Sequence, residues 1–173
     1  MTLHLVRHGH PAVDPAVPAR RWRLDHSRVD EVRALRTSGR VPAAAVWCTS
    51  PEMKALETSR ALMSGPVAVV DDLREHDRDA GWLDDFDGTV ARAFEAPDAA
   101  AVPGWEPLRA CAERIGAAYE RLRGEHPTAP LVLVGHATAW TLLVAHLSSL
   151  PVDGSLLPRW RAWRMPDVVA LDA

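Results

Sequence analysis

Short apolar runs alternate with amphipathic stretches along most of this chain. The runs lie at residues 2–6, 43–48, 67–70 and 131–134, and each has the length of a strand. The last run is Leu-Val-Leu-Val without a polar residue, which is typical of a central parallel strand buried on both faces. Strands that alternate with helices in this way predict an α/β fold.

Apolar residues spaced three or four apart predict helices between these runs. They are expected from Asp25 or Ser27 to about Thr37, from Ser50 to Gly65, near Val90–Ala96, from Pro107 to about Arg123, and from Thr138 or Ala139 to about Ser149. In the second of them, Ser50 is expected to be the N-cap and Pro51 the first helical residue.

The tail from Arg159 to Leu171 alternates arginine with tryptophan before Met165-Pro166-Asp167. This alternation predicts a hairpin or an edge pair whose charges keep the sheet edge from pairing with other chains. Stacking on single-stranded nucleic acid is a less favoured interpretation, because three arginines in an acidic protein are thin support for it.

Composition favours an ordinary globular protein and excludes several classes. The 173 residues are 47% hydrophobic and 25% charged, so we expect residues 1–173 to form a single domain. The net charge of -3 gives no general attraction to nucleic acid or to a membrane, so any anion site must be local. Cys48 and Cys111 lack the spacing of a disulfide framework or a metal site, and no signal peptide or membrane span is visible. We therefore expect a cytoplasmic protein with reduced thiols.

Several expected strand ends carry residues suited to holding phosphate. Arg7 and His8 end the first strand, where open α/β sheets place their ligands. His136 ends the buried fourth strand beside a helix start, which is the geometry of an anion site. Lys54, the only lysine of the chain, lies in a first helical turn, where the helix dipole disfavours a cation and a bound anion would account for it. By contrast, we expect a structural role for His146.

The segment after the third run offers groups for acid–base chemistry. Glu75 and Asp77 are both candidates, and their residue types alone do not choose between them. Residues 10–23 are expected to form a loop across the mouth of the site, and residues 78–106 a loop with one short helix. Substrate specificity is expected in these two segments. The acids of the second have no calcium-loop register, and we expect no metal site.

Taken together, these segments resemble the histidine phosphatase superfamily, which includes phosphoglycerate mutases and many small phosphatases. The resemblance runs in the family's order from Leu3 to about Leu150. It lies in Arg7-His8-Gly9, in Thr49-Ser50-Pro51 through Lys54-Ala55-Leu56-Glu57-Thr58, in Leu73-Arg74-Glu75, and in Val134-Gly135-His136. It implies a three-layer α/β/α sandwich around a mostly parallel sheet, similar to that of phosphoglycerate mutase.

The resemblance also implies a catalytic role for each motif. His8 would be the nucleophile that takes up the phosphoryl group, and Glu75 would be the proton donor. Arg7, Lys54 and His136 would hold the phosphoryl oxygens, and neither a metal nor a cofactor is implied. Because Glu75 must be protonated when it donates and ionised when it later activates water, an environment that raises its pKa would help.

Three positions depart from the family pattern. Lys54 stands where the family usually has a second arginine, so the positive charge is kept but the two-pronged fork is lost. Ala137 and Arg28 stand where the family often has glycine.

We therefore expect a metal-independent phosphatase that acts on a small-molecule phosphomonoester. The alternatives are a phosphoglycerate-type mutase, which is usually longer, and a weakly active phosphate-binding or signalling domain, which Lys54 makes plausible. A protein-phosphohistidine phosphatase is a special case of the first. The sequence selects neither the substrate nor the oligomeric state, and Trp82 or Trp105 could line either an interface or the pocket.

Overall fold

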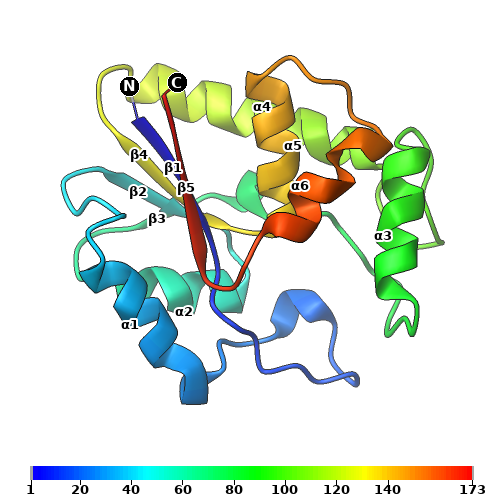
Figure 1. Cartoon of the computed structure of the whole chain (residues 1–173), viewed down its shortest axis with the longest axis horizontal. Helices are drawn as coiled ribbons and strands as arrows, with labels where there is room; N and C mark the ends of the chain where they lie inside the picture. Colours follow the sequence, from blue (N-terminus) through cyan, green and yellow to red (C-terminus); the bar gives the residue numbers. More distant parts are fainter. Residues whose placement is uncertain (1, 173) are drawn as a thin grey trace.

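A five-stranded sheet runs through the computed structural model, which describes residues 2–172 (Figure 1). Its strands are β1 (Thr2–Arg7), β2 (Val46–Thr49), β3 (Ala68–Val69), β4 (Leu131–Gly135) and β5 (Asp167–Asp172). They lie in the order β3-β2-β4-β1-β5, and only the β1–β5 pair is antiparallel. All five residues of β4 are buried, as predicted for the central strand.

Helices cover both faces of the sheet (Figure 1). They are α1 (Val29–Thr37), α2 (Met53–Leu62), α3 (Phe86–Glu95), α4 (Leu108–Glu125), α5 (Ala137–Leu147) and α6 (Leu157–Ala162). Successive strand residues point to opposite faces, so Leu3 and Leu5 pack in the core beneath α4 and α5, while Val6 packs beneath α1 and α2. The expected three-layer α/β/α sandwich around a mostly parallel sheet is confirmed.

The start of α2 differs from the prediction. Ser50 is not the N-cap and Pro51 is not helical, because Glu52 is the N-cap and the helix begins at Met53. The backbone N–H of Ser50 donates to the carbonyl of Val134 at 2.9 Å, so the pairing of β2 with β4 continues one residue past the strand. The Ser50 hydroxyl still accepts from the Glu52 N–H at 3.3 Å, and it also makes a tertiary contact described below.

The tail also differs, since Leu157–Ala162 form helix α6 and only Asp167–Asp172 form an edge strand. The expectation of a hairpin or edge pair around Met165-Pro166-Asp167 is therefore wrong for residues 159–162, which are helical, and right for residues 167–171, which form an edge strand beside β1. Trp160 and Trp163 are three residues apart, a spacing that places side chains on one face of a helix but on opposite faces of a strand. The indole of Trp160 in α6 donates to Thr138 at 3.1 Å, and that of Trp163, directly after α6, donates to Thr141 at 3.2 Å, so both pack against α5.

Other boundaries shift by a few residues. Helix α3 starts at Phe86, four residues before its predicted start, because the Asp85 carboxylate caps it by accepting from the Gly88 N–H. Strand β2 starts at Val46, where pairing with β4 begins at Leu131. Within residues 2–172, no helix combines the length and the apolar composition needed to span a membrane.

Candidate active site

The predicted site residues meet at the carboxyl ends of β1, β2 and β4. A cleft of about 1290 Å³ opens there, and Arg7, His8, Lys54 and Glu75 line it. His136 does not line the cleft: it is fully buried behind His8, and the two imidazole centroids are 5.1 Å apart. The fold therefore brings together residues that lie up to 129 positions apart in the sequence, counted from Arg7 to His136.

The backbone holds His8 in one tautomer. Its N–H donates to the carbonyl of Gly135 at 2.9 Å, which extends the pairing of β1 with β4. Its ring Nδ1 lies 2.6 Å from the Gly9 carbonyl, and because a carbonyl can only accept, the proton must be on Nδ1. The lone pair of a neutral His8 is consequently on Nε2. Burial, reinforced by the nearby charges of Lys54 and Arg7, lowers the pKa of His8 well below 6.5, so the ring is neutral at pH 7.

Gly9 is required by a close approach rather than by a turn with positive φ. A Cβ atom there would lie 2.6 Å from Val32 Cγ2 and 2.7 Å from Leu24 Cδ1. The Gly9 N–H donates to Thr58 Oγ1 at 3.0 Å, and Thr58 donates in turn to the Lys54 carbonyl at 2.7 Å. Helix α2 thus fixes the backbone that carries His8.

His136 is joined to β2 through Ser50. Its Nε2 lies 2.7 Å from Ser50 Oγ and 3.6 Å from the nearer carboxylate oxygen of Glu52. Burial, reinforced by Lys54, lowers the pKa of His136 to about 3, so this ring is also neutral at pH 7. Within residues 2–172, His136 Nδ1 and Arg7 Nε are buried without a hydrogen-bond partner. Arg7 Nε is thus a donor without a partner among these residues, and His136 Nδ1 is a second one in the tautomer in which the Ser50 hydroxyl donates to Nε2.

Glu52 is a member of the site that the sequence did not reveal. Its carboxylate is nearly buried and forms a very short ion pair with Lys54 Nζ. The other carboxylate oxygen accepts from the Glu75 N–H at 2.9 Å. Lys54 Nζ also donates to the Ala19 carbonyl at 2.7 Å, which ties the 10–23 loop to the site. The only sequence signal was a carboxylate two positions before the only lysine, and it reads equally well as a helix-start acid.

Glu75 lies at the N-terminus of α5. Its carboxylate accepts from the N–H groups of Thr138 at 3.4 Å and Ala139 at 3.1 Å, and from its neighbour His76 at 3.0 Å. Such donors favour the ionised form of a carboxyl group.

The pKa of Glu75 is shifted in the direction opposite to the one that would help a proton donor. Burial acts to raise this pKa, but the charge of Arg78 and the hydrogen bond from the His76 amide outweigh it, and the pKa falls below its ordinary value. Asp77, the alternative acid, lies further out: its side chain is 46% exposed and 3.9 Å from Arg20. Glu75 is therefore the better-placed acid, and it is ionised in the unliganded protein at pH 7.

Two arginines that the sequence did not single out support this region. Arg78 donates to Thr138 Oγ1 at 2.7 Å, and its positive charge is among the causes of the low pKa values of Glu75 and His136. Arg114 of α4 donates to the carbonyls of Asp72, Arg74 and Glu75 at 2.8, 3.0 and 3.2 Å. Arginines are frequent in this chain, so only tertiary structure distinguishes these two.

The two segments expected to set specificity both line the cleft. Residues from 10–23 and from 81–86 are among those that line it. A guanidinium nitrogen of Arg20 lies 3.9 Å from a carboxylate oxygen of Asp77 and 3.6 Å from one of Asp79, so it connects the first segment to the start of the second. Of the two tryptophans left open between an interface and the pocket, both Trp82 and Trp105 line this cleft.

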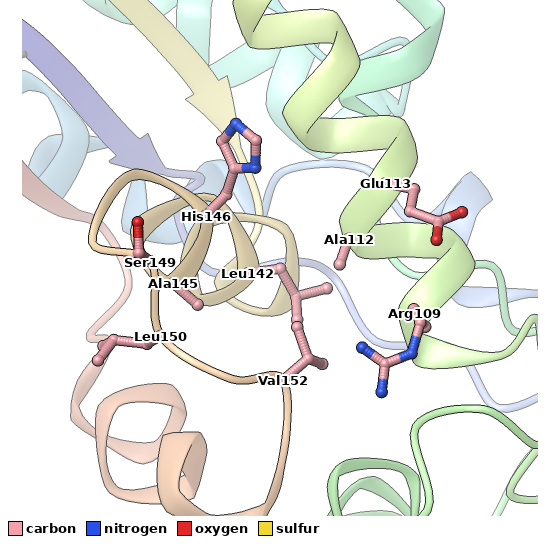
Figure 2. A pocket seen from close by; sticks show the side chains of 9 residues that line it. All are labelled: Arg109, Ala112, Glu113, Leu142, Ala145, His146, Ser149, Leu150 and Val152. Carbon is pink, nitrogen blue, oxygen red and sulfur yellow. The ribbon is translucent and has the colours of Figure 1, made fainter.

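A smaller hollow of about 370 Å³ lies between α4 and α5, with Val152 at its rim (Figure 2). None of the predicted site residues lines it. His146 borders this hollow and lies 3.1 Å from the Glu120 carboxylate, a surface contact that suits the structural role expected of it.

Comparison with known proteins identifies the family. The model of the histidine phosphatase superfamily (branch 1) matches residues 3–162, so the chain belongs to this superfamily. A comparison with curated protein sequences returns no match.

Solved structures of similar fold include phosphatases. YhfR of Bacillus stearothermophilus is 21% identical with a TM-score of 0.74, over 88% of this chain and 82% of that one. Mycobacterial glucosyl-3-phosphoglycerate phosphatase is 20% identical with a TM-score of 0.74, over 98% and 88%. Phosphoserine phosphatase of Entamoeba histolytica, in complex with 3-phosphoglyceric acid, is 12% identical with a TM-score of 0.75, over 98% and 89%. At these identities the likeness establishes the fold.

Proposed function

We propose that this protein is a metal-independent phosphatase that hydrolyses a phosphomonoester through a phosphohistidine on His8. The observation that carries the proposal is the state of His8. Its ring is neutral, and the Gly9 carbonyl holds the ring proton on Nδ1, which leaves the lone pair on Nε2. His8 lines the cleft together with Arg7 and Lys54. A buried, oriented and uncharged imidazole is what attack on phosphorus requires.

The first step transfers the phosphoryl group to the protein. Nε2 of His8 forms a bond to phosphorus while the bond from phosphorus to the ester oxygen breaks. Arg7, Lys54 and His136 stabilise the charge on the equatorial oxygens, in part through Arg7 Nε, and through His136 Nδ1 in the tautomer in which Ser50 donates to Nε2. Glu75 supplies the proton that converts the departing alkoxide to an alcohol.

The second step regenerates His8. The Glu75 carboxylate accepts a proton from a water molecule, whose oxygen forms a bond to phosphorus as the bond to Nε2 breaks. Inorganic phosphate and neutral His8 are the products. Glu75 must enter the first step protonated, although its pKa is low in the unliganded protein. The negative charge of a bound phosphate would raise this pKa, and a substrate monoanion would carry the proton into the site itself.

One observation favours a second candidate, a phosphate-binding domain with little turnover. Lys54 Nζ is already bound by Glu52 and by the Ala19 carbonyl, so a phosphoryl group must compete for it. With Lys54 engaged in this way, fewer positive groups are free to bind the phosphoryl oxygens than the resemblance implied. Stabilisation of the transition state would then be weaker.

Hydrolysis of 4-nitrophenyl phosphate in the presence of EDTA tests the proposal. We expect turnover by the wild type and its loss in His8→Ala. His10→Ala is the matched control, because His10 also lines the cleft but contacts Glu31 at 3.6 Å instead of the site. Turnover that survives in His8→Ala would contradict the proposal. Absence of turnover in the wild type, with inorganic phosphate still bound, would favour the binding domain.

A further inference from the structure

The cleft is far larger than a phosphate group needs. Its volume of about 1290 Å³ exceeds the range of about 300–1000 Å³ found for sites that hold drug-sized ligands. Arg7, His8 and Lys54 occupy its inner end, at the strand termini. If the phosphoryl group is bound there, as proposed above, most of the cleft faces the alcohol part of the substrate.

That outer part is lined by aromatic side chains. Four of the seven tryptophans and one of the two phenylalanines line the cleft, and we call them the aromatic wall: Trp22, Trp82, Phe86, Trp105 and Trp160. They come from four separate segments of the chain. The Trp22 and Trp82 rings are 6.5 Å apart between centroids, and Phe86 lies 6.1 Å from Trp105 and 6.5 Å from Trp160.

Burial in the core does not account for the whole wall. Trp82 is 53% exposed and Phe86 39% exposed, although aromatic residues usually gain stability by full burial. Five large hydrophobic residues within residues 2–172 are exposed, and three of them, Val13, Trp82 and Phe86, line this one cleft. Exposed apolar surface that gathers in a cleft is characteristic of a ligand site.

The rings are held in place before any ligand arrives. The Trp22 indole N–H donates to the carbonyls of Asp14 and Val17, each at 2.9 Å. The Trp82 indole N–H donates to the Asp84 carboxylate at 3.2 Å. These bonds leave the ring faces free while they fix the indole edges, so less conformational entropy is lost when a ligand binds.

Arg78 joins the aromatic wall to the phosphate end. Its guanidinium lies 5.0 Å from the ring centroids of both Phe86 and Trp105, while one of its nitrogens donates to Thr138 Oγ1. A planar cation fixed in this way continues the stacking surface towards His8 and attracts electron-rich rings.

We infer that the aromatic wall is a binding subsite for a planar aromatic or heteroaromatic ring in the alcohol part of the substrate, with Trp82 as its main stacking face. The inference rests on the proposed function for the position of the phosphoryl group. It predicts that ring-bearing phosphomonoesters, such as nucleoside monophosphates, are preferred over aliphatic phosphates of three to five carbons.

Two pairs of substrates with matched leaving groups test the inference. Adenosine 5′-monophosphate and ribose 5-phosphate share a primary alkoxide and differ by the heterocycle. 2-Phenylethyl and 2-cyclohexylethyl phosphate have similar size and differ in planarity, which separates stacking from hydrophobicity. We expect kcat/KM to favour the planar member of each pair by about 5- to 150-fold, the range that stacking of one base on an aromatic side chain supplies.

The Trp82→Ala variant should reduce both preference ratios to near one, and Trp82→Phe should restore much of them. Leu150→Ala is the control, because Leu150 is 44% exposed but lies outside the cleft. Ratios near one in the wild type, or ratios unchanged in Trp82→Ala, would overturn the inference. Equal turnover within each pair that is lost in His8→Ala would overturn the subsite and leave the phosphatase proposal standing.

Calorimetric binding of the same four esters to His8→Ala tests the subsite without turnover. A preference for the planar esters that disappears in His8→Ala/Trp82→Ala supports the subsite even if the wild type hydrolyses nothing. Equal affinity within each pair overturns it. The failure of the subsite and the failure of the phosphatase proposal therefore give different results.

Discussion

At the scale of single residues, the charge balance around Lys54 is the unusual feature of this site. Glu52 and Lys54 are both nearly buried, and each is the other's ion-pair partner. The two charges of a buried pair attract each other strongly because the surrounding dielectric constant is low. A phosphoryl group can therefore bind Lys54 only if the carboxylate of Glu52 loses its partner charge. Glu52 therefore sets how much of the Lys54 charge is available to a ligand.

Replacing Glu52 with Gln should tighten the binding of inorganic phosphate by about tenfold, the scale of one charge-assisted hydrogen bond. Gln keeps an oxygen that accepts from the Glu75 N–H, so the backbone contact survives. Calorimetric titration measures the dissociation constant. The gain should shrink in the Lys54→Met background, and Glu31→Gln, whose side chain is 42% exposed, is the surface control. Weaker binding in Glu52→Gln would show that Glu52 supports the site in another way.

Replacing Glu75 with Gln should lower kcat/KM for an alkyl phosphate by about 10²–10⁴-fold, since an alkoxide is a poor leaving group without a proton donor. An aryl phosphate should lose less.

Because the pKa of Glu75 lies below its ordinary value, the protonated form declines as pH rises, and wild-type kcat/KM should fall from pH 5 to pH 8. Steady-state kinetics over this range measure both effects. A negligible loss in Glu75→Gln with a large one in Asp77→Asn would transfer the role to Asp77.

The positions of the main site residues could be predicted because they depend on short-range features of the sequence. Arg7 ends an apolar strand, His8 and His136 each directly follow one, and Lys54 lies in the first turn of a helix. The contacts of Glu52 could not be predicted, because its partners Glu75 and His136 lie 23 and 84 positions away. The low pKa of Glu75 was missed for the same reason, since Arg78 and the α5 amides reach it only in the folded chain.

At the scale of elements, helix α4 holds the acid segment in place from a distance. Arg114 lies on this helix and donates to the carbonyls of Asp72, Arg74 and Glu75, as well as to the Glu106 carboxylate. Glu106 also accepts from the Asp77 N–H at 2.8 Å. The segment has no regular structure beyond the 3₁₀ turn Asp71–Leu73, so these bonds determine where Glu75 lies.

The Arg114→Ala variant should therefore lower kcat for an alkyl phosphate by about 10²-fold, because a displacement of about 1 Å of a catalytic group has this effect. The affinity for inorganic phosphate should change little, since Arg114 does not line the cleft. Arg121→Ala is the matched control on the same helix: its side chain is 49% exposed and contacts only the carboxylate of Asp72. Equal effects of the two variants, or loss of phosphate affinity in Arg114→Ala, would contradict a positioning role.

Elements were predicted well where a single hydrophobic periodicity runs through the segment, and poorly where the sequence fits both the helical and the strand period. The central strand Leu131–Gly135 and the long helix Leu108–Glu125 belong to the first kind. The tail belongs to the second, because arginine and tryptophan alternate over residues 159–161 as in a strand, whereas Trp160 and Trp163 have helical spacing. Both tryptophans contact α5, through Thr138 and Thr141, and no local feature of the tail reports these contacts.

At the scale of the whole molecule, the sheet order places β4 between β1 and β2. The carboxyl ends of these three strands therefore lie at one edge of the sheet. There β1 leads into His8, β4 leads into His136, and β2 leads into the helix that carries Lys54. This arrangement follows from parallel strands whose carboxyl ends meet. It also requires three histidines, His8, His76 and His136, to be buried at 5%, 3% and 0% exposure beside cationic groups.

Burying these histidines should make the fold sensitive to acid. Burial, with Arg78 nearby, lowers the pKa of His76 to about 4, and burial with Lys54 lowers that of His136 to about 3. In the unfolded chain a histidine titrates at about 6.5, so below this pH the unfolded state binds protons that the folded state does not. Stability is thus complete above pH 6.5 and declines as pH falls towards 4, by about 1.4 kcal/mol per pH unit for each histidine.

Urea unfolding of the wild type between pH 7 and pH 5 measures this decline directly. The His76→Gln variant should have a shallower pH dependence by about 1.4 kcal/mol per pH unit, because one proton fewer is taken up on unfolding. Gln can still donate to the Glu106 carbonyl that lies 2.8 Å from His76 Nε2, so the variant should fold. An exposed histidine such as His26, whose side chain is 70% exposed, provides the control His26→Gln.

A wild-type stability that stays constant down to pH 5, or a slope unaltered in His76→Gln, would mean that the buried rings take up protons within the fold. In that case His8 would be partly protonated at mildly acidic pH, and its Nε2 would no longer be free to attack phosphorus.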